Sequence, residues 1–345
     1  MELIAYDKNF NLITYLAPSI IQWNRRYYEP GDFEIQIFAE DYQKEFKYLY
    51  TADRPEVGII EKVSYSHQDN EGQFITQKGR FMEQVLNDKV TWPTFYGKGE
   101  ITAVIMQMVN QYKDDIPLLD VSMLNEGTNV DFQSTGDELG TKAADILRQQ
   151  EMAYRISYDF DAQKLIFNIY KGTSRTASEN DGNMVTFTTA YGNVYNILAD
   201  VDDSNYKNYA IVAGQGEGAD RISVVVDISN GEYKKVLFVD AAYLQQEDGA
   251  SLEDYKAQLT NEGNQKLLEH LSVRNVEFDA LAGEYEYMTD YDIGTKCDII
   301  IDEVKLSMEA RIIAIYEVLQ ENEHTITLEF GDKIMTQYEK ARLKK

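Results

Sequence analysis

The chain has 345 residues, of which 43% are hydrophobic and 12% aromatic, and its formal net charge is −26. This length favours two or three compact units, because single hydrophobic cores stop growing at roughly 250–300 residues. The 25 Tyr and 14 Phe, with only 5 Pro, exclude a disordered chain and favour a strand-rich one. The acidic excess excludes the basic face with which proteins grip nucleic acid, and it suits either simple solubility or work beside DNA that must not adhere.

Cys297 is the single cysteine, so an intrachain disulfide is excluded and a reducing compartment of folding is expected. The start of the chain, Met1–Asp7, lacks the basic and apolar regions of a signal peptide. No apolar run approaches the ~18 residues that a membrane span requires. We therefore expect synthesis in a host cytoplasm and no membrane insertion.

Residues 1–92 are predicted to form an N-terminal β domain. Phe33, Ile35 and Ile37 alternate with polar residues, which is the period of a half-buried strand. Asp69–Gly72 is a hairpin signal between two long strands. The predicted strands are Leu3–Tyr6, Leu12–Leu16, Ile20–Phe38 with a break at Glu29–Asp32, Val57–Tyr65 and Phe74–Val85.

Residues 93–185 are predicted to form an α/β domain. Apolar residues from Ile101 to Tyr112 recur at spacings of three and four, which predicts a helix that ends within Asp114–Pro117. A second helix is expected over Glu138–Gln150, followed by a hairpin of Tyr154–Tyr158 and Leu165–Tyr170. The polar segment 171–185 is expected to be an exposed loop or linker.

The remaining residues are predicted to form a second β domain from two segments, 186–240 and 275–335, with a helical insertion at 241–274 and a basic tail at 336–345. Ser251–Asp254 has the pattern of a capping box, which opens a helix to about Leu271 with Leu252, Tyr255, Leu259 and Leu267 on its inner side. Gly263 weakens that helix. The predicted strands are Tyr209–Ala213, Ile222–Asp227, Lys235–Val239, Val276–Phe278, Lys296–Ile301, Glu309–Val318 and Thr325–Phe330.

Two hairpins of the sequence are similar to each other. Val57–Tyr65 followed by Phe74 onward resembles Ala310–Val318 followed by Thr325 onward. In each, a long Ile/Val-rich strand meets an acidic turn and then a strand in which Thr alternates with apolar residues. The similarity fits either two related β units, one near each end of the chain, or the general chemistry of hairpins.

The sequence predicts no catalytic, cofactor-binding or metal site. His67, His270 and His324 are far apart, no Gly-x-Ser-x-Gly motif is present, and Cys297 has no histidine partner nearby in sequence. One cysteine cannot make a structural zinc site. The 59 acidic residues produce too many chance pairs for a glycosidase pair to be identified.

Two further segments have weak functional signatures. The loop Ala213–Asp220 contains Gly-x-Gly-x-Gly, but it leads into a strand and carries two carboxylates, whereas a phosphate loop leads into a helix. A loop with several glycines suits a tight turn away from a sheet, as at a subunit contact or the rim of a pore. Asp290–Gly294 resembles the start of a calcium loop but lacks the later ligands, so a turn before a strand is expected.

An ordered set of motifs spans nearly the whole chain. They are Glu29–Ile37, Ile166–Arg175, Val212–Arg221, Val239–Ala241 with the helix after it, and Tyr291–Thr295 before the closing strands that end at Gly331. Through these residues the chain resembles the siphophage and prophage minor tail or tail-hub proteins, which are related in fold to the baseplate hub of contractile tails.

The resemblance implies an α+β, β-rich fold with two β-barrel-like tube domains, an α/β domain and a helical insertion. It also implies a non-enzymatic structural hub at the distal end of a phage tail tube, in which a homotrimer forms a pseudo-sixfold ring that lets DNA pass. The implied partners are the distal tail protein, the tape measure and the tail-tip or fibre proteins, in the virion. A hexameric distal-tail adaptor and a carboxylate-dependent tail hydrolase are the alternatives.

Overall fold

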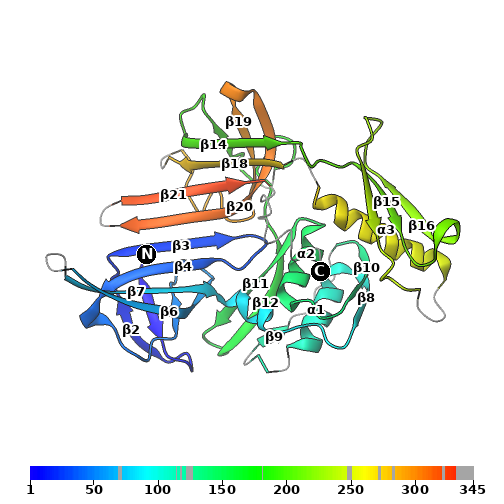
Figure 1. The fold of residues 1–345 in the computed structure, drawn as a ribbon. Helices are drawn as coiled ribbons and strands as arrows, with labels where there is room; N and C mark the ends of the chain where they lie inside the picture. Colours follow the sequence, from blue (N-terminus) through cyan, green and yellow to red (C-terminus); the bar gives the residue numbers. More distant parts are fainter. Residues whose placement is uncertain are drawn as a thin grey trace.

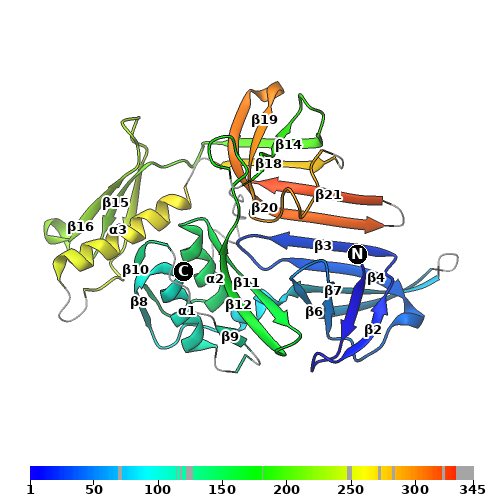
Figure 2. The same cartoon turned by 180° about the vertical axis from the view of Figure 1, so that it is seen from behind.

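The computed structural model describes residues 1–331 apart from 69–71, 114, 117–118, 122–126, 181, 247–250, 271–272, 282–283 and 321–322. Thirteen of the described strands belong to one sheet, ordered β14-β18-β21-β20-β3-β4-β7-β6-β5-β1-β2, and β19 joins β13 to β20. Figures 1 and 2 show this sheet as two β units stacked edge to edge, with the helices beside them. The structure confirms the predicted α+β, β-rich class.

The first of these units, the N-terminal β unit, spans β1 to β7. Burial alternates along β4, where Phe33, Ile35 and Ile37 point into the core, so the predicted period of two is confirmed. Trp23 and Phe81 complete the aromatic part of this core. Its elements are β1 (Leu3–Tyr6), β2 (Leu12–Leu16), β3 (Ile20–Arg26), β4 (Asp32–Phe38), η1 (Ala39–Asp41), β5 (Tyr48–Tyr50), β6 (Val57–Gln68) and β7 (Gly72–Phe81).

The end of this unit differs from the prediction. The strand expected over Phe74–Val85 stops at Phe81, because residues Met82–Asp88 form the 3₁₀ helix η2. Met82 and Leu86 of η2 are buried in the core of the following α/β domain. The apolar side chains of η2 pack into the core of the α/β domain. The sequence pattern cannot tell such residues from apolar residues that continue the strand. Of the expected turn Asp69–Gly72, residues 69–71 lie outside the described part of the chain.

The α/β domain follows, and its core contains the predicted stripe of α1. Glu100 caps this helix, since its carboxylate accepts hydrogen bonds from the backbone N–H groups of Thr102 (3.0 Å) and Ala103 (2.8 Å). Residues 114 and 117, predicted to end the helix, lie outside the described residues. The elements are β8 (Phe95–Glu100), α1 (Ile101–Tyr112), β9 (Leu119–Val121), β10 (Asn129–Ser134), α2 (Leu139–Arg148), β11 (Met152–Asp159) and β12 (Lys164–Lys171).

The segment 171–185 is a mostly exposed loop between β12 and β13, as its polar composition predicted, but three of its residues anchor it to the C-terminal strands. Thr176 and Val185 are fully buried, and Ser174 is nearly so. Backbone hydrogen bonds tie the segment to the strand that starts at Lys296, through Arg175 N–H to Lys296 O (2.8 Å). Polar residues are tolerated inside because their hydroxyl groups find partners, as Thr176 does with Glu179 O (3.1 Å).

The C-terminal β unit contains the predicted closing strands and two short strands that the sequence did not reveal. Its core gathers Phe187, Phe278 and Phe330, with Cys297 and Ile299 beside them. β13 and β14 were missed because their apolar runs are short and interrupted by polar residues. The elements are β13 (Thr186–Thr188), β14 (Val194–Asp202), β18 (Val273–Ala280), β19 (Lys296–Ile301), η4 (Asp302–Val304), β20 (Leu306–Gln320) and β21 (Glu323–Phe330).

Between β14 and β18 the chain forms a small sheet, β16-β15-β17, covered by helix α3. The observed pairing differs from the prediction, which placed these strands in the second β domain and left 241–274 as a separate helical insertion. The capping box of Ser251 and Asp254 is confirmed. The elements are β15 (Tyr209–Ala213), η3 (Gly218–Asp220), β16 (Ser223–Asp227), β17 (Val236–Asp240) and α3 (Leu252–Leu268).

Gly263 explains why α3 lies on these strands. A Cβ at this position would come within 2.6 Å of Val212 and 2.7 Å of Val226, so glycine permits the close approach of helix and sheet. Tyr255, Leu259 and Leu267 are buried, as predicted, whereas Leu252 is exposed because the first turn of the helix projects beyond the sheet. Residue 271, where the helix was predicted to end, lies outside the described residues.

Candidate functional site: the junction of two related β units

The two β units are built on the same five-strand plan. The N-terminal unit has the order β3-β4-β7-β6-β5, and the C-terminal unit has the order β14-β18-β21-β20-β19. Antiparallel ladders join all neighbours in both sets. The hairpins with similar sequences, β6–β7 and β20–β21, take the same place in the two plans, so the similarity noted in the sequence is a similarity of structure.

The register makes the equivalence specific. Each hairpin ladder is interrupted by one bulge, at Glu61 in β6 and at Ile313 in β20. Seven residue pairs follow each bulge, and the pair before it is Ile60–Gly79 in one unit and Ile312–Phe330 in the other. Bulges are placed features of a sheet rather than accidents, so a shared bulge supports a true structural repeat.

The two units meet through paired strands. The half of β20 that follows its bulge pairs antiparallel with β3, from Ala314 opposite Arg26 to Gln320 opposite Ile20. Figure 1 shows β20 and β3 side by side at the middle of the stack. Backbone hydrogen bonds therefore continue from one unit into the other without a break, so that β20 and β3 are interior strands of one continuous sheet.

Arg25 on β3 is the centre of a buried charge network at this junction, with 1% of its surface exposed. Its guanidinium donates to Glu56 Oε1 (2.9 Å) and to the Tyr287 hydroxyl (3.1 Å), and it also forms an ion pair with Asp292. Burial lowers the pKa of Arg25, but Glu56, Tyr287 and Asp292 more than offset this and hold it well above its ordinary value. The network joins three segments that are far apart in sequence.

A second buried pair crosses the same junction. Arg54, from the segment between β5 and β6, donates to both carboxylate oxygens of Glu317 on β20, at 2.9 and 3.0 Å. Nε2 of His324 lies 2.8 Å from Glu317 Oε1. The arrangement orients the two units, because removal of either partner would leave a charge buried without compensation.

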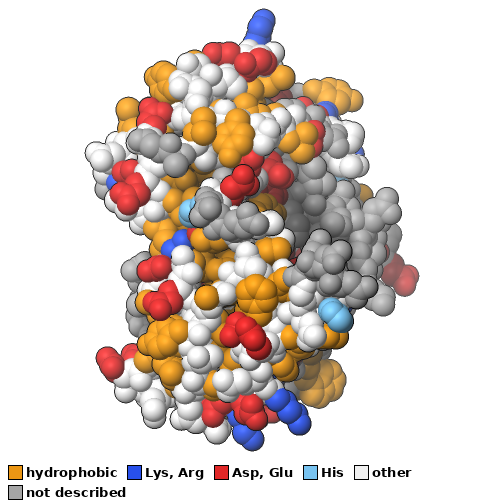
Figure 3. Space-filling view, turned by 90° about the vertical axis from the view of Figure 1, so that its left-hand side faces the viewer, with side chains coloured by type: hydrophobic (Ala, Val, Ile, Leu, Met, Phe, Trp, Pro, Cys, Tyr) orange, Lys and Arg blue, Asp and Glu red, His pale blue; other side chains and the backbone are white. Residues whose placement is uncertain are grey.

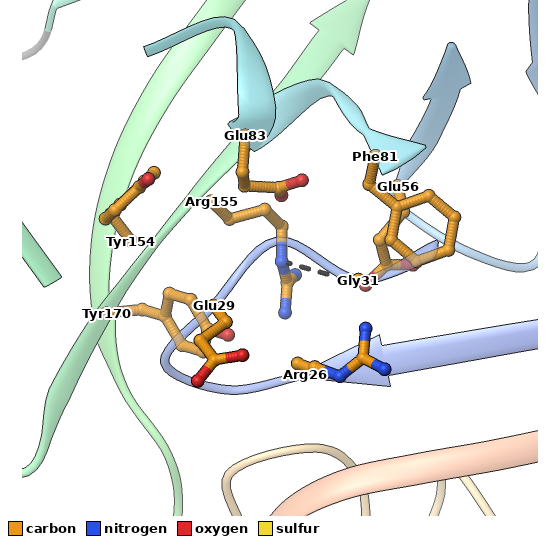
Figure 4. Close-up of a pocket in the computed structure, with 9 residues that line it drawn as sticks. All are labelled: Arg26, Glu29, Gly31, Glu56, Phe81, Glu83, Tyr154, Arg155 and Tyr170. Atoms are coloured by element: carbon orange, nitrogen blue, oxygen red, sulfur yellow. Dashed lines mark ion pairs between the residues drawn. The ribbon is translucent and has the colours of Figure 1, made fainter. Parts of the chain in front are cut away.

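A small cavity lies beside this network, between the N-terminal β unit and the α/β domain (Figure 4). Its volume of about 10 Å³ suits roughly one water molecule, far below the several hundred Å³ of a substrate site. Glu83 lines it and accepts a hydrogen bond from the Ile156 N–H (3.1 Å). Burial raises the pKa of Glu83 to about 7. In Figure 4, Arg155 reaches toward Glu56 and not Glu83.

The structure keeps the three histidines apart and without a nucleophile. His67 is exposed on β6, His270 Nδ1 lies 3.1 Å from Asn205 O, and His324 contacts Glu317. Cys297 is fully buried in the C-terminal β unit, where burial raises the pKa of its thiol. Among the described residues, no group of His, Cys, Asp or Glu side chains is placed to hold a metal ion.

The glycine-rich loop after β15 is closed by its own side chains. Arg221 donates to Gly214 O and Ala213 O (both 2.7 Å), and it pairs with Asp240. The hydroxyl of Tyr255 accepts from Gln215 N–H (2.8 Å). The donors that a phosphate would need are thus engaged within the protein: the Gln215 N–H by Tyr255, the Gly214 N–H by Ile222 O (2.8 Å), and the Arg221 guanidinium by carbonyl and carboxylate oxygens. The other suspected loop, Asp290–Gly294, forms a turn before β19 and gives Asp292 to Arg25.

The sequence did not point to the junction residues, because each ion pair joins positions more than thirty residues apart. One local signal was present. Arg25 stands in phase with Ile21 and Trp23, the core-facing residues of β3, so a charge was placed on the buried face. A buried arginine requires carboxylate partners, which only the folded chain supplies.

Figure 3 shows the side of the molecule where the hairpins β6–β7 and β20–β21 end. Hydrophobic and acidic side chains are mixed across this face, and Lys and Arg side chains are few. No helix in the described part of the chain is long and apolar enough to cross a membrane.

Comparisons with known proteins identify the family. The model of the family described as Siphovirus ReqiPepy6 Gp37-like protein matches residues 3–332. No curated protein matches the chain. The fold is similar to that of a tail protein from Neisseria meningitidis MC58, at 12% identity and a TM-score of 0.59 over 96% of this chain and 97% of that one.

Two prophage tail proteins have the same fold. Prophage tail protein gp18 from Listeria monocytogenes EGD-e has 11% identity and a TM-score of 0.58, over 100% of this chain and 98% of that one. The 43 kDa tail protein of prophage MuSo2 from Shewanella oneidensis has 12% identity and a TM-score of 0.58, over 96% and 98%. The chain belongs to the Siphovirus ReqiPepy6 Gp37-like family.

Proposed function

We propose that this tail protein is a structural hub at the distal end of the tail tube, where three copies form a pseudo-sixfold ring. The observation that carries the proposal is the structural repeat, because each chain holds two β units of one plan and register. Three chains then supply six such units, the number that a sixfold tube requires. The N-terminal β unit and the C-terminal β unit would be the two tube domains, with the small sheet β16-β15-β17 outside them.

The polar face of the long sheet suits the wall of a DNA conduit. On the C-terminal β unit this face carries Glu277, Asp279 and Glu329 in adjacent positions of β18 and β21. Their repulsion adds to burial in raising the pKa of Glu277. Three chains at −26 each carry −78 in all, which would repel the phosphates of passing DNA. Sequence-specific nucleic-acid binding has no place in this function.

The hub acts without catalysis or a cofactor in this proposal, and it binds the distal tail protein, the tape measure and tip or fibre proteins. The dispersed histidines, the buried thiol and the water-sized cavity support this reading. Cell-wall hydrolysis by the purified chain, abolished by a single carboxylate substitution, would contradict it.

Light scattering coupled to size exclusion tests the subunit number. A trimer has a mass of about 119 kDa, three times the 39.7 kDa of the chain. A stable assembly of that mass with a central pore in electron micrographs is the expected result. A closed hexamer of about twice this mass would favour a distal-tail adaptor.

A further inference from the structure

The long sheet has an unpaired edge at β6. Strand β5 pairs with β6 only at Val57–Ile59, and one further backbone hydrogen bond joins Ile60 N–H to Lys47 O (2.9 Å). Beyond the bulge at Glu61, no described strand pairs with the side of β6 that faces away from β7. In the C-terminal unit the equivalent edge of β20 is the one that pairs with β3.

Side-chain burial shows the same contrast. Val63 and Tyr65 of β6 are 43% and 59% exposed. Their equivalents on β20, counted from the bulge, are Ile315 and Glu317, which are 0% and 1% exposed. The β20 positions are covered because the N-terminal β unit lies against them. The β6 positions have the same orientation and lack that cover.

The second free edge belongs to β14, which ends the sheet and pairs with β18 alone among the described strands. β14 is the equivalent of β3, since Ala199 lies opposite Val276 as Trp23 lies opposite Phe33. Tyr195 and Leu198 expose 38% and 55% of their surface on this strand. An exposed apolar edge is a site for pairing with another chain unless it is blocked.

We propose that the free edge of β6 in one copy pairs antiparallel with the free edge of β14 in the next copy, which repeats between chains the β20–β3 junction within the chain. The proposal rests on the trimeric ring and names the strands that close it. The in-chain register fixes the partners. They are Lys62–Asp202, Val63–Val201, Ser64–Asp200, Tyr65–Ala199 and Ser66–Leu198.

Two details of the edges agree with this register. Lys62 falls diagonally across from the exposed Asp200, within reach of a long side chain. The bulge of β14 lies between Tyr195 and Leu198, beyond the last of the five pairs, so the paired stretch is regular on both strands. A head-to-tail contact of this kind uses one edge from each copy, and it closes into a ring of three when successive copies are related by a rotation of about 120°.

Disulfide trapping tests the register. In the variant Ser66→Cys/Leu198→Cys, directly opposed residues bring the two Cα atoms to about 4.5–5.5 Å, which suits a disulfide. Oxidation is expected to give a covalent trimer on a non-reducing gel. Ser66→Cys/Ala199→Cys is the matched control, because a shift of one residue turns the second thiol to the other face. Gln22→Cys/Val318→Cys, the same register within the chain, should give an intrachain bond.

A second variant tests the edge without cysteines. Val63 lies on the face of β6 that continues the core face of the sheet, but it is exposed in the single chain. Val63→Glu places a charge at this position, where the strand of a neighbouring copy would bury it, and should therefore convert the trimer to monomers. Val236→Glu on β17 is the control, since Val236 has a similar exposure of 46% and lies outside the long sheet. It should leave the trimer intact.

The outcomes separate the two proposals. A native trimer that forms no Ser66→Cys/Leu198→Cys disulfide and survives Val63→Glu would overturn the strand pairing and leave the trimeric hub standing. A chain that remains monomeric at every concentration and forms no interchain disulfide would overturn both. Equal trapping of the in-register and shifted pairs would also overturn the proposed register.

Discussion

The two β units have one plan but fill their cores in opposite ways. In the N-terminal unit Phe33 lies close to Gly58 and Gly79, where a Cβ would come within 2.5 and 3.1 Å of its ring. In the C-terminal unit the residue equivalent to Phe33 is the smaller Val276, and the residue equivalent to Gly79 is Phe330. The comparison indicates that the sheet requires a given total volume and leaves open which strand supplies it.

The polar faces of the two units also differ at equivalent positions, here in the charges of their side chains. Glu34 on β4 pairs with Lys78 on β7 in the N-terminal unit. The equivalent positions in the C-terminal unit are Glu277 and Glu329, which repel each other. One unit thus balances its charges, whereas the other accumulates negative charge. Stability alone does not explain that difference, whereas the proposed role of this face as the wall of a DNA conduit would.

The largest effect is expected from the junction that holds the two units together. Arg25→Met removes the close ion pair of the buried Glu56 and leaves it only the longer one to Arg155 (4.0 Å), so the free energy of unfolding should fall by about 3–5 kcal/mol. Denaturant unfolding measures this change. Arg80→Met, in the exposed pair with Glu61, should cost less than about 1 kcal/mol. Equal losses in the two variants would show that the buried network does not stabilise the junction.

Glu83 differs from the ion-paired Glu56, because the described residues give it a hydrogen bond from the Ile156 N–H but no ion pair. Its pKa rises from 4.5 to about 7 on folding, so the folded chain binds the extra proton and stability falls as the pH rises through this interval. Glu83→Gln should remove that loss. We expect a gain of about 2–3 kcal/mol at pH 8 and little change near pH 4.

Unfolding curves at the two pH values check this prediction. Glu61→Gln is the control, as its carboxylate is partly exposed and paired with Arg80. A Glu83→Gln gain that is the same at both pH values would rule out proton uptake by Glu83 as its cause.

The different packing of the two cores predicts a smaller change in the free energy of unfolding for a substitution that makes one core more like the other. Gly58→Ala gives the N-terminal unit the residue that the C-terminal unit has at Ala310, but its Cβ would meet the Phe33 ring at 2.5 Å. We expect a net cost of about 1–2 kcal/mol, since overpacking is partly offset by the lower entropy of the unfolded alanine chain. In a Phe33→Leu background the same substitution should cost less. An additive double-mutant cycle would contradict the direct contact.

The smallest effect concerns the polar faces. Glu277→Gln removes one member of the repelling pair and should raise the free energy of unfolding by at most about 0.5 kcal/mol at pH 7. Because the pKa of Glu277 is raised, this gain should vanish as the pH falls and the carboxyl becomes protonated. Glu34→Gln breaks an ion pair with Lys78 and should have the opposite sign at pH 7. Matching signs would show that the two faces do not differ electrostatically.

Much of the fold follows from the sequence. The strict alternation of Phe33, Ile35 and Ile37 determined a half-buried strand, and the stripe from Ile101 to Tyr112 determined an amphipathic helix. These signals are local, since the period of buried residues follows from backbone geometry alone. The ordered motifs across the chain also indicated a siphophage protein family, which the match to the Siphovirus ReqiPepy6 Gp37-like family confirms.

Other features depended on contacts between distant segments. Arg25 and Glu56 read as ordinary charged residues until β3 and the segment before β6 met. The mostly exposed loop 171–185 is anchored through the buried Ser174 and Thr176, because β19 offers hydrogen-bond partners to its backbone. Likewise, strands Tyr209–Ala213 and Ser223–Asp227 joined helix α3 because Gly263 allows the helix to approach them.

Sequence similarity alone left the relation between the two hairpins open. Register and the shared bulges at Glu61 and Ile313 decided it in favour of a structural repeat. The sequence therefore determined which residues form strands and helices, because that depends on local periodicity. The tertiary structure decided which strands pair, which charges are buried together and which edges remain free, because these depend on contacts between segments that are distant in sequence, from 31 residues for Arg25–Glu56 to 263 for Arg54–Glu317.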